Sequence, residues 1–225
     1  RLWSQYSDQS IAVLCQTINL SPDLLADAAK QARVDLHAPR NAPWNDAELL
    51  DFLSRDDVQA IVLPHLKAER EGLLAYLHKF GFEPHANTER LLVDIGWRGT
   101  IQDNLAQVVK GRIHGCYFGL EGFLNAQPDN VSKDGYIKDV PAGLGLKLAD
   151  VAALEFLFNT SGGSVKGYRG GAPVREVLEG EEAIATGPVA GFQDQISYFA
   201  RSLAETIRQQ GLVSADLRAV SRELV

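Results

Sequence analysis

A pattern of strand, helix and strand within about 30 residues constrains the fold of this chain more than any other sequence feature. Residues 91–95 are a short apolar run ended by Gly96, as expected of a strand buried on both faces. Apolar residues then repeat at intervals of four and three over residues 100–109, and a second run rich in β-forming residues follows at 113–120. A helix between two such runs predicts a right-handed βαβ unit with parallel strands.

Helices are predicted for most of residues 1–88. The sequence Ser-Pro-Asp at residues 21–23 is a helix start signal, with Ser as the cap and Pro at the first helical position. Asn45 is expected to cap a short second helix. A longer helix over about 56–80 is expected to be kinked or divided at Pro64, because proline removes a backbone donor.

The part of the chain after residue 120 shows weaker patterns. Residues 121–147 carry several Gly, Pro, Asn and Asp and predict a long loop with one short strand near 136–140. The remaining elements expected are a helix over 149–158, a hairpin of 165–168 and 174–178, a long amphipathic helix containing Phe192, Ile196, Phe199 and Leu203, and a last helix capped by Ser214.

The predicted fold class is therefore α/β. A helical N-terminal part, residues 1–88, precedes residues 89–225, where a small parallel sheet containing the βαβ unit is flanked by helices. The two parts form separate domains or one continuous domain, and length alone does not choose between them.

Charge and cysteine content indicate the cellular compartment and argue against some classes of partner. A net charge of -7 without clustered Lys and Arg argues against nucleic acid as a partner. Cys15 and Cys116 have no CxxC or Cys/His spacing, so no disulfide framework or metal site is indicated. No apolar run approaches the roughly 20 residues of a membrane span, and no signal peptide is recognised. We expect a cytoplasmic domain, and interpret a chain that starts at Arg1 and has no methionine as a fragment of a larger protein.

The turn at residues 94–100 is the first candidate site, because ligands of open α/β sheets bind beyond the carboxyl ends of strands. Gly96 and Gly99 would let the backbone approach a ligand closely. Arg98 would pair with a phosphate, and Trp97 would stack on a sugar or base.

Two further residues of this turn have candidate roles. Asp94, at the strand end, is the candidate catalytic residue and would hold ligand hydroxyls or a metal, and the Thr100 backbone N–H would face an anion. The alternative is purely structural. Thr100 and Asp103 have the spacing of a capping box, and the two glycines then only make a tight turn.

A second candidate is a nest of backbone N–H groups and hydroxyls that would bind an anion. Its residues are Ser161, Gly162, Gly163, Ser164 and Tyr168. A simple loop before a strand is the alternative interpretation. The sequence identifies no cofactor, and it contains no GxSxG, Walker or HExxH motif.

Several segments together resemble one family of bacterial proteins. These segments are residues 91–102, 68–70, 73–77, 115–120, 154–158, 163–165 and 167–168, with Gln193 and Gln195. They are similar to haloacid-dehalogenase-superfamily hydrolases that are fused or linked to glycosyltransferases, and the resemblance covers most of residues 55–205. It implies a role in capsule, O-antigen or similar surface-polysaccharide synthesis, C-terminal to a phosphatase-like domain. Gln102 joins the expected ligand set on this basis.

The resemblance does not imply phosphatase activity. That chemistry needs a nucleophilic Asp and a second Asp two positions later, whereas Asp94 is followed there by Gly96. Three hypotheses stay open. The chain binds a sugar phosphate or nucleotide sugar at residues 94–100, or it is a noncatalytic module that joins a phosphatase-like domain to a glycosyltransferase. The third is a phosphoribosyltransferase-like enzyme, because the turn is also loosely similar to that family's phosphate loop.

Overall fold

The computed structural model describes residues 9–83, 87–144, 154–155 and 157–211, and the chain divides into two compact units. Residues 1–84 with 165–174 form the helical unit, and residues 85–164 with 175–225 form the α/β unit. Helices, a parallel sheet and a small two-stranded sheet confirm the predicted α/β class.

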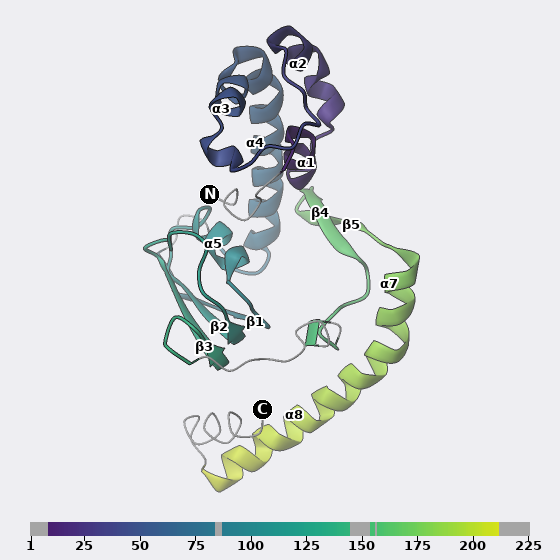
Figure 1. Cartoon of the computed structure of the whole chain (residues 1–225). Helices are drawn as coiled ribbons and strands as arrows, with labels where there is room; N and C mark the ends of the chain where they lie inside the picture. Colours follow the sequence, from purple (N-terminus) through teal and green to yellow (C-terminus); the bar gives the residue numbers. More distant parts are fainter. Residues whose placement is uncertain (1–8, 84–86, 145–153, 156, 212–225) are drawn as a thin grey trace. The chain divides into compact units, whose positions relative to one another are not determined.

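Short helices surround one long helix in the helical unit. Its helices are α1 (Ile11–Thr17), η2 (Pro22–Leu25), α2 (Ala26–Ala32), η3 (Pro43–Asn45), α3 (Ala47–Ser54) and α4 (Asp56–His78). In Figure 1, α3 lies on one side of α4, and α1 with α2 lies on the other. Buried aliphatic side chains from these helices form one core cluster, in which Leu25, Leu49 and Val58 are fully buried. The helical unit is therefore held mainly by non-directional apolar contacts.

One local prediction in this unit was wrong, and a second was wrong in part. Asp46, not Asn45, caps α3, and its carboxylate accepts a hydrogen bond of 2.9 Å from the backbone N–H of Leu49. Arg40 also binds this carboxylate, which adds an ion pair that the local sequence does not reveal. Helix α4 is not divided at Pro64, since it runs unbroken from Asp56 to His78.

The predicted hairpin is confirmed as β4 (Ser164–Arg169) and β5 (Ala172–Glu176). Its central residues pack in the helical unit. The Tyr168 ring lies 5.1 Å from that of Tyr76, and the Tyr168 N–H donates to Glu69 of α4. A Cβ at Gly72 would lie 2.4 Å from the Tyr168 carbonyl oxygen, so the close approach of α4 and β4 depends on that glycine.

The α/β unit contains a parallel sheet in the order β1-β2-β3. The strands are β1 (Arg90–Asp94), β2 (Ile113–Leu120) and β3 (Val131–Asp139), and α5 (Thr100–Ala106) joins the first two. Both strand pairs are parallel, which confirms the predicted pairing of residues 91–95 with 113–118 through a helix. Strand β3 includes most of the short strand expected near residues 136–140, but it begins at Val131 and so replaces part of the expected long loop.

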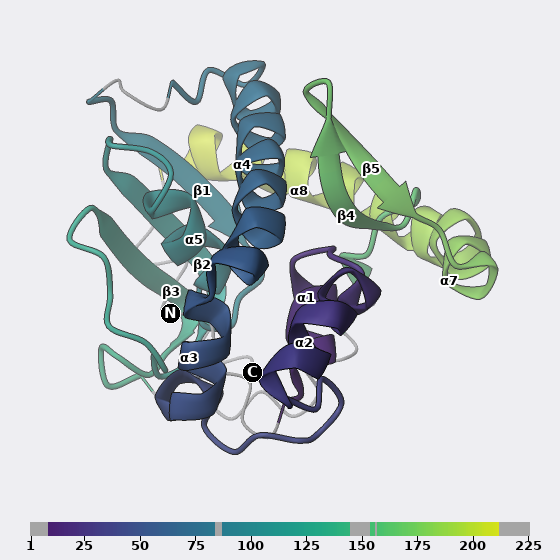
Figure 2. The ribbon, with the colours of Figure 1, turned by 90° about the horizontal axis from the view of Figure 1, so that it is seen from above.

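A loop without a helix, residues 121–130, connects the parallel strands β2 and β3. The Asn130 side-chain amide donates to the carbonyls of Ala106, Val109 and Gly111, at 3.2 Å each. These bonds satisfy carbonyls at and beyond the end of α5 and hold the end of the loop to it. Figure 2 shows α5 beside the sheet.

The last described elements are α7 (Glu179–Ile184), the π-helical segment η4 (Ala185–Val189) and α8 (Ala190–Gln210). Helix α8 confirms the predicted long amphipathic helix, but its apolar residues are exposed, with Phe192 at 59% and Phe199 at 65%. The helix expected from Ser214 and most of the one expected over 149–158 lie outside the described residues. Within the described ranges, no helix has both the length and the apolar character of a membrane span.

Candidate ligand site at the strand ends

The turn after β1 is fastened to the end of β2 by backbone contacts. The Ile95 carbonyl accepts from Gly119 at 3.1 Å, and the Trp97 carbonyl accepts from Glu121 at 2.6 Å. A Cβ at Gly96, where φ is +143°, would lie 2.3 Å from the Gly119 carbonyl oxygen. Gly96 therefore lets the turn approach the chain's own backbone, rather than a ligand.

The second glycine of the turn makes room for two side chains from the sheet. Gly99 is the N-cap of α5 with φ +66°, and a Cβ there would lie 2.7 Å from the Lys133 side chain and 2.8 Å from the Tyr117 hydroxyl. Thr100 is the first helical residue, and no side chain caps the helix. The capping-box interpretation is thus wrong, and Asp103 instead pairs with Lys133 at 2.6 Å.

Trp97 and Arg98 are both partly buried and both bonded within the unit. The Trp97 indole N–H donates to a Glu155 carboxylate oxygen at 2.8 Å. The Arg98 guanidinium donates to the Gly122 carbonyl, and the Arg98 carbonyl accepts from the Lys133 ammonium at 3.1 Å. Arg98 is therefore not directed into bulk solvent, and Trp97 is not enclosed in the core.

Gln102 of α5, expected in the ligand set, is instead fully buried. Its side-chain N–H group donates to the Ile113 carbonyl of β2 at 2.8 Å and to the Ser132 carbonyl of β3 at 2.9 Å. Its oxygen accepts from the Tyr117 hydroxyl at 2.7 Å. Burial raises the pKa of Tyr117, so the hydroxyl stays protonated and keeps donating at neutral pH.

Lys133 of β3 is a buried cation that the sequence did not reveal, because its strand was read as loop. Its side chain is 2% exposed, and its ammonium contacts the carboxylate of Asp103, the amide oxygen of Gln127 at 2.7 Å and the Arg98 carbonyl. It also lies 4.7 Å from the centre of the Phe123 ring. Burial lowers the Lys133 pKa, and Asp103 opposes that effect. This network fixes the turn to β3 and to the loop 121–130.

A cavity of about 450 Å³ lies at the carboxyl-terminal end of β1 and beside residues within β2 and β3. Its lining residues come from all three strands and the segment near residue 158: Val93, Asp94, Ile95, Cys116, Tyr117, Phe118, Tyr136 and Phe158. Small-molecule sites typically have this size and a largely apolar wall with few polar groups. Asp94 is the only acidic residue among the described residues of this lining, so the predicted catalytic residue lies at the cavity.

Phe158 is held in the cavity wall from two directions. The Gln193 amide of α8 donates to the carbonyls on either side of it, those of Leu157 at 2.9 Å and Asn159 at 2.5 Å. Trp97 binds Glu155 of the same segment. Trp97 and Gln193 therefore act here as positioning residues for an aromatic wall.

The second predicted cluster has some of its backbone groups bonded within the chain. The Gly162 N–H donates to the Glu182 carboxylate at 2.7 Å, and the Gly163 carbonyl accepts from Arg175 at 3.0 Å. An internal carboxylate thus takes an N–H group of the expected anion nest. None of the five residues predicted for this cluster is among the described lining residues of the cavity: Ser161, Gly162, Gly163, Ser164 and Tyr168.

Neither a metal centre nor a known relative points to a function for this site. Across the part of the chain that the structure describes, no three His, Cys, Asp or Glu side chains gather as metal ligands would. No protein-family model matches the chain, and no curated protein matches its sequence.

Proposed function

We propose that this chain is a cytoplasmic domain of a bacterial surface-polysaccharide biosynthesis protein, and that it binds a sugar phosphate or nucleotide sugar at the carboxyl ends of β1, β2 and β3. The cavity at the end of β1 and beside the later residues of β2 and β3 is the observation that carries the proposal. Ligands of open α/β sheets bind in this position, because the strand ends and their loops leave a crevice there. The capsule or O-antigen setting rests on the sequence resemblance alone.

The lining suits the ring of such a ligand. Phe118, Tyr136 and Phe158 supply aromatic surface on which a base or the apolar face of a sugar stacks. The Asp94 carboxylate accepts hydrogen bonds from sugar hydroxyls, and it is the lining group suited to take a proton from one of them.

The phosphate of the ligand requires a cation, and no Lys or Arg is among the described residues around the cavity. Arg98, in the turn that follows Asp94, is the candidate. Its described bond to the Gly122 carbonyl uses one N–H of a guanidinium that carries five. We therefore assign the ring to the cavity and the phosphate to its rim.

Thermal-shift and calorimetric titration with nucleoside diphosphate sugars, sugar 1-phosphates and phosphoribosyl pyrophosphate test this proposal. A ligand at 100 times its dissociation constant should stabilise the fold by about 2.7 kcal/mol. Asp94→Asn should weaken binding at least tenfold, and Arg98→Ala should cost roughly 1.5–3 kcal/mol for phosphorylated ligands only. Asp134→Asn, which changes an exposed carboxylate of the same sheet outside the lining, is the matched control.

A response to phosphoribosyl pyrophosphate alone would favour the phosphoribosyltransferase-like alternative. A flat panel would favour the noncatalytic module, for which α8 supplies an observation of its own. Phe192, Phe199 and Leu203 are exposed along one helix and offer apolar area to a docking domain. In that case Phe199→Ser should abolish association with the parent protein's other domains. Tyr198→Ser, which removes a neighbouring exposed ring, is the variant for comparison.

A further inference from the structure

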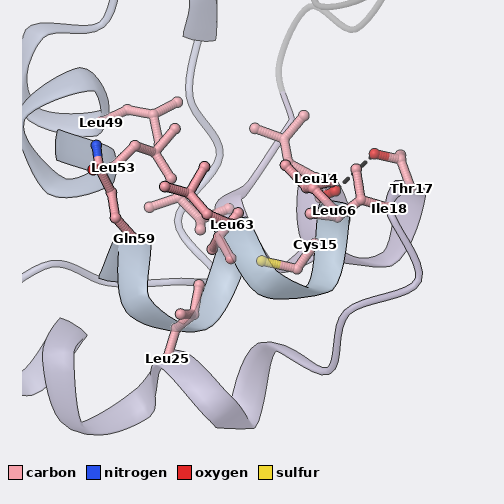
Figure 3. Close-up of a pocket in the computed structure, with 12 residues that line it drawn as sticks. Leu14, Cys15, Thr17, Ile18, Leu25, Leu49, Leu53, Gln59, Leu63 and Leu66 are labelled. Atoms are coloured by element: carbon pink, nitrogen blue, oxygen red, sulfur yellow. Dashed lines mark hydrogen bonds between the residues drawn. The ribbon is translucent and has the colours of Figure 1, made fainter. Parts of the chain in front are cut away.

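A second cavity, of about 280 Å³, lies within the helical unit and belongs to none of the chemistry described above. Its lining comes from α1, η2, α3 and α4: Ile11, Leu14, Cys15, Thr17, Ile18, Leu25, Leu49, Leu53, Gln59, Val62, Leu63 and Leu66. Figure 3 shows Leu63 of α4 between Leu49 and Leu53 on one side and the α1 side chains on the other. Except for Cys15, Thr17 and Gln59, every lining residue is aliphatic.

We infer that this cavity binds one aliphatic chain with an uncharged polar end. Well-packed interiors leave few voids larger than a water molecule, so an apolar space of this size departs from ordinary core packing. Apolar cavities of about 150 Å³ made in other proteins stay dry and take up small hydrocarbons such as benzene. The larger space here, walled by leucine, isoleucine and valine, suits a flexible chain of methylene groups.

The polar atoms of the lining exclude a charged occupant. The Thr17 hydroxyl donates to the Leu14 carbonyl of its own helix at 2.7 Å. The Cys15 thiol is buried, and burial raises its pKa, so it stays neutral at pH 7. Among the described lining residues there is no Lys, Arg, Asp or Glu, and a buried charge without a partner is costly.

The polar end of the ligand is assigned to the mouth of the cavity. Leu63 and Leu66 line the cavity and are 56% and 38% exposed, so α4 places part of the apolar wall in contact with solvent. Gln59, one turn before Leu63, is also exposed and lines the same space. An amide both donates and accepts hydrogen bonds, which suits a hydroxyl, ester or amide head group.

Calorimetric titration of the full chain with straight-chain 1-alkanols and the matching carboxylates tests the inference. Affinity for the alkanols should rise about fourfold per methylene until the cavity is full, and then level off. At pH 8 the carboxylate of equal length should bind at least tenfold more weakly. Equal affinity for alcohol and carboxylate, or a rise with length that never levels off, would indicate nonspecific adsorption and overturn the assignment.

Two measurements locate the bound chain. Leu63→Trp, at an exposed lining position, should fill the mouth and weaken 1-decanol binding at least tenfold. Leu50→Trp, at an exposed position outside the lining, should leave it unchanged, and circular dichroism verifies that both variants fold. Equal binding by the two variants would place the ligand elsewhere.

Bound 1-decanol should also slow alkylation of Cys15 by N-ethylmaleimide at least fivefold. Cys116, exposed and in the α/β unit, is the internal control and should react at an unchanged rate. Unprotected Cys15 despite measurable decanol binding would refute the site. These outcomes are independent of sugar-phosphate binding, because the two cavities share no lining residue.

Discussion

The helical unit and the α/β unit both bury apolar side chains, but the α/β unit also buries a hydrogen-bonded amide. Leu25, Leu49 and Val58 are fully buried in the helical unit, whereas in the α/β unit the amide Gln102 of α5 is fully buried together with apolar residues such as Ile113. Apolar contacts are non-directional, so a helical core of leucines leaves the exact fit between helices loosely specified. Hydrogen bonds are directional, and those of Gln102 fix α5 against two neighbouring strands.

This difference bears on function. The helical unit retains an apolar cavity among its helices, and such a cavity is suited to a ligand recognised by shape and hydrophobicity. In the α/β unit, Lys133 and Gln102 tie the turn, the helix and the strands together. Asp94 is thus held at a strand end whose surroundings are rigidly positioned, as a site for a polar ligand requires.

The largest expected effect is loss of core packing in the helical unit. Phe52→Ala removes a side chain that is 2% exposed and should destabilise the unit by about 3–5 kcal/mol. Hydrogen exchange should show the lost protection in α1 to α4 and leave β1 to β3 protected. Leu50→Ala, at an exposed position of the same helix, should have little effect. Equal loss of protection in the sheet would show that the two units unfold together.

Substitutions at Gln102 and Tyr117 in the α/β unit should lower stability in a different way. They leave buried polar groups without partners, whereas Phe52→Ala removes side-chain volume. Gln102→Leu removes the partner of two strand carbonyls and of the Tyr117 hydroxyl, and should cost roughly 2–4 kcal/mol in urea unfolding. Tyr117→Phe should cost about 1–2 kcal/mol. The double variant should lose less than the sum, because it no longer buries a hydroxyl without a partner. Additive losses would contradict a shared network.

Alkaline pH should lower the stability of both units, by less than the substitutions above. Burial raises the pKa of Tyr117 and of Cys15, so each folded unit keeps a proton that the unfolded chain releases. Stability from each group is therefore complete below its unfolded pKa and is lost as pH rises, by up to about 1.4 kcal/mol per pH unit. The loss should begin near pH 8.5 for Cys15 and near pH 10 for Tyr117.

Urea unfolding of matched variants between pH 7 and 11 measures this effect. Tyr117→Phe should remove the loss that begins near pH 10, and Cys15→Ala should remove the earlier one. Because other groups titrate in the same range, the informative quantity is the difference from the unmodified chain at each pH. Identical pH profiles for Tyr117→Phe and the unmodified chain would show that Tyr117 carries no such linkage.

Local patterns were sufficient to predict the elements that have strong periodicity. The apolar run at residues 91–95, the helical spacing after Gly99 and the β-rich run of β2 each identify an element without reference to distant residues. Helix α8 was predicted for the same reason. By contrast, β3 was read largely as loop, since Lys133, Asp134 and Lys138 make its sequence polar.

The sequence alone thus determined the parallel β1 and β2 pair and the position of Asp94 at a strand end, because both follow from the order of adjacent elements. Only the tertiary structure showed that Lys133 is paired with Asp103 and that Gln102 bridges two strands. Whether a polar residue is a ligand or a core contact depends on partners distant in sequence. The cavities were not predicted from the sequence for the same reason. Each is bounded by side chains from several elements, and no local pattern relates those elements.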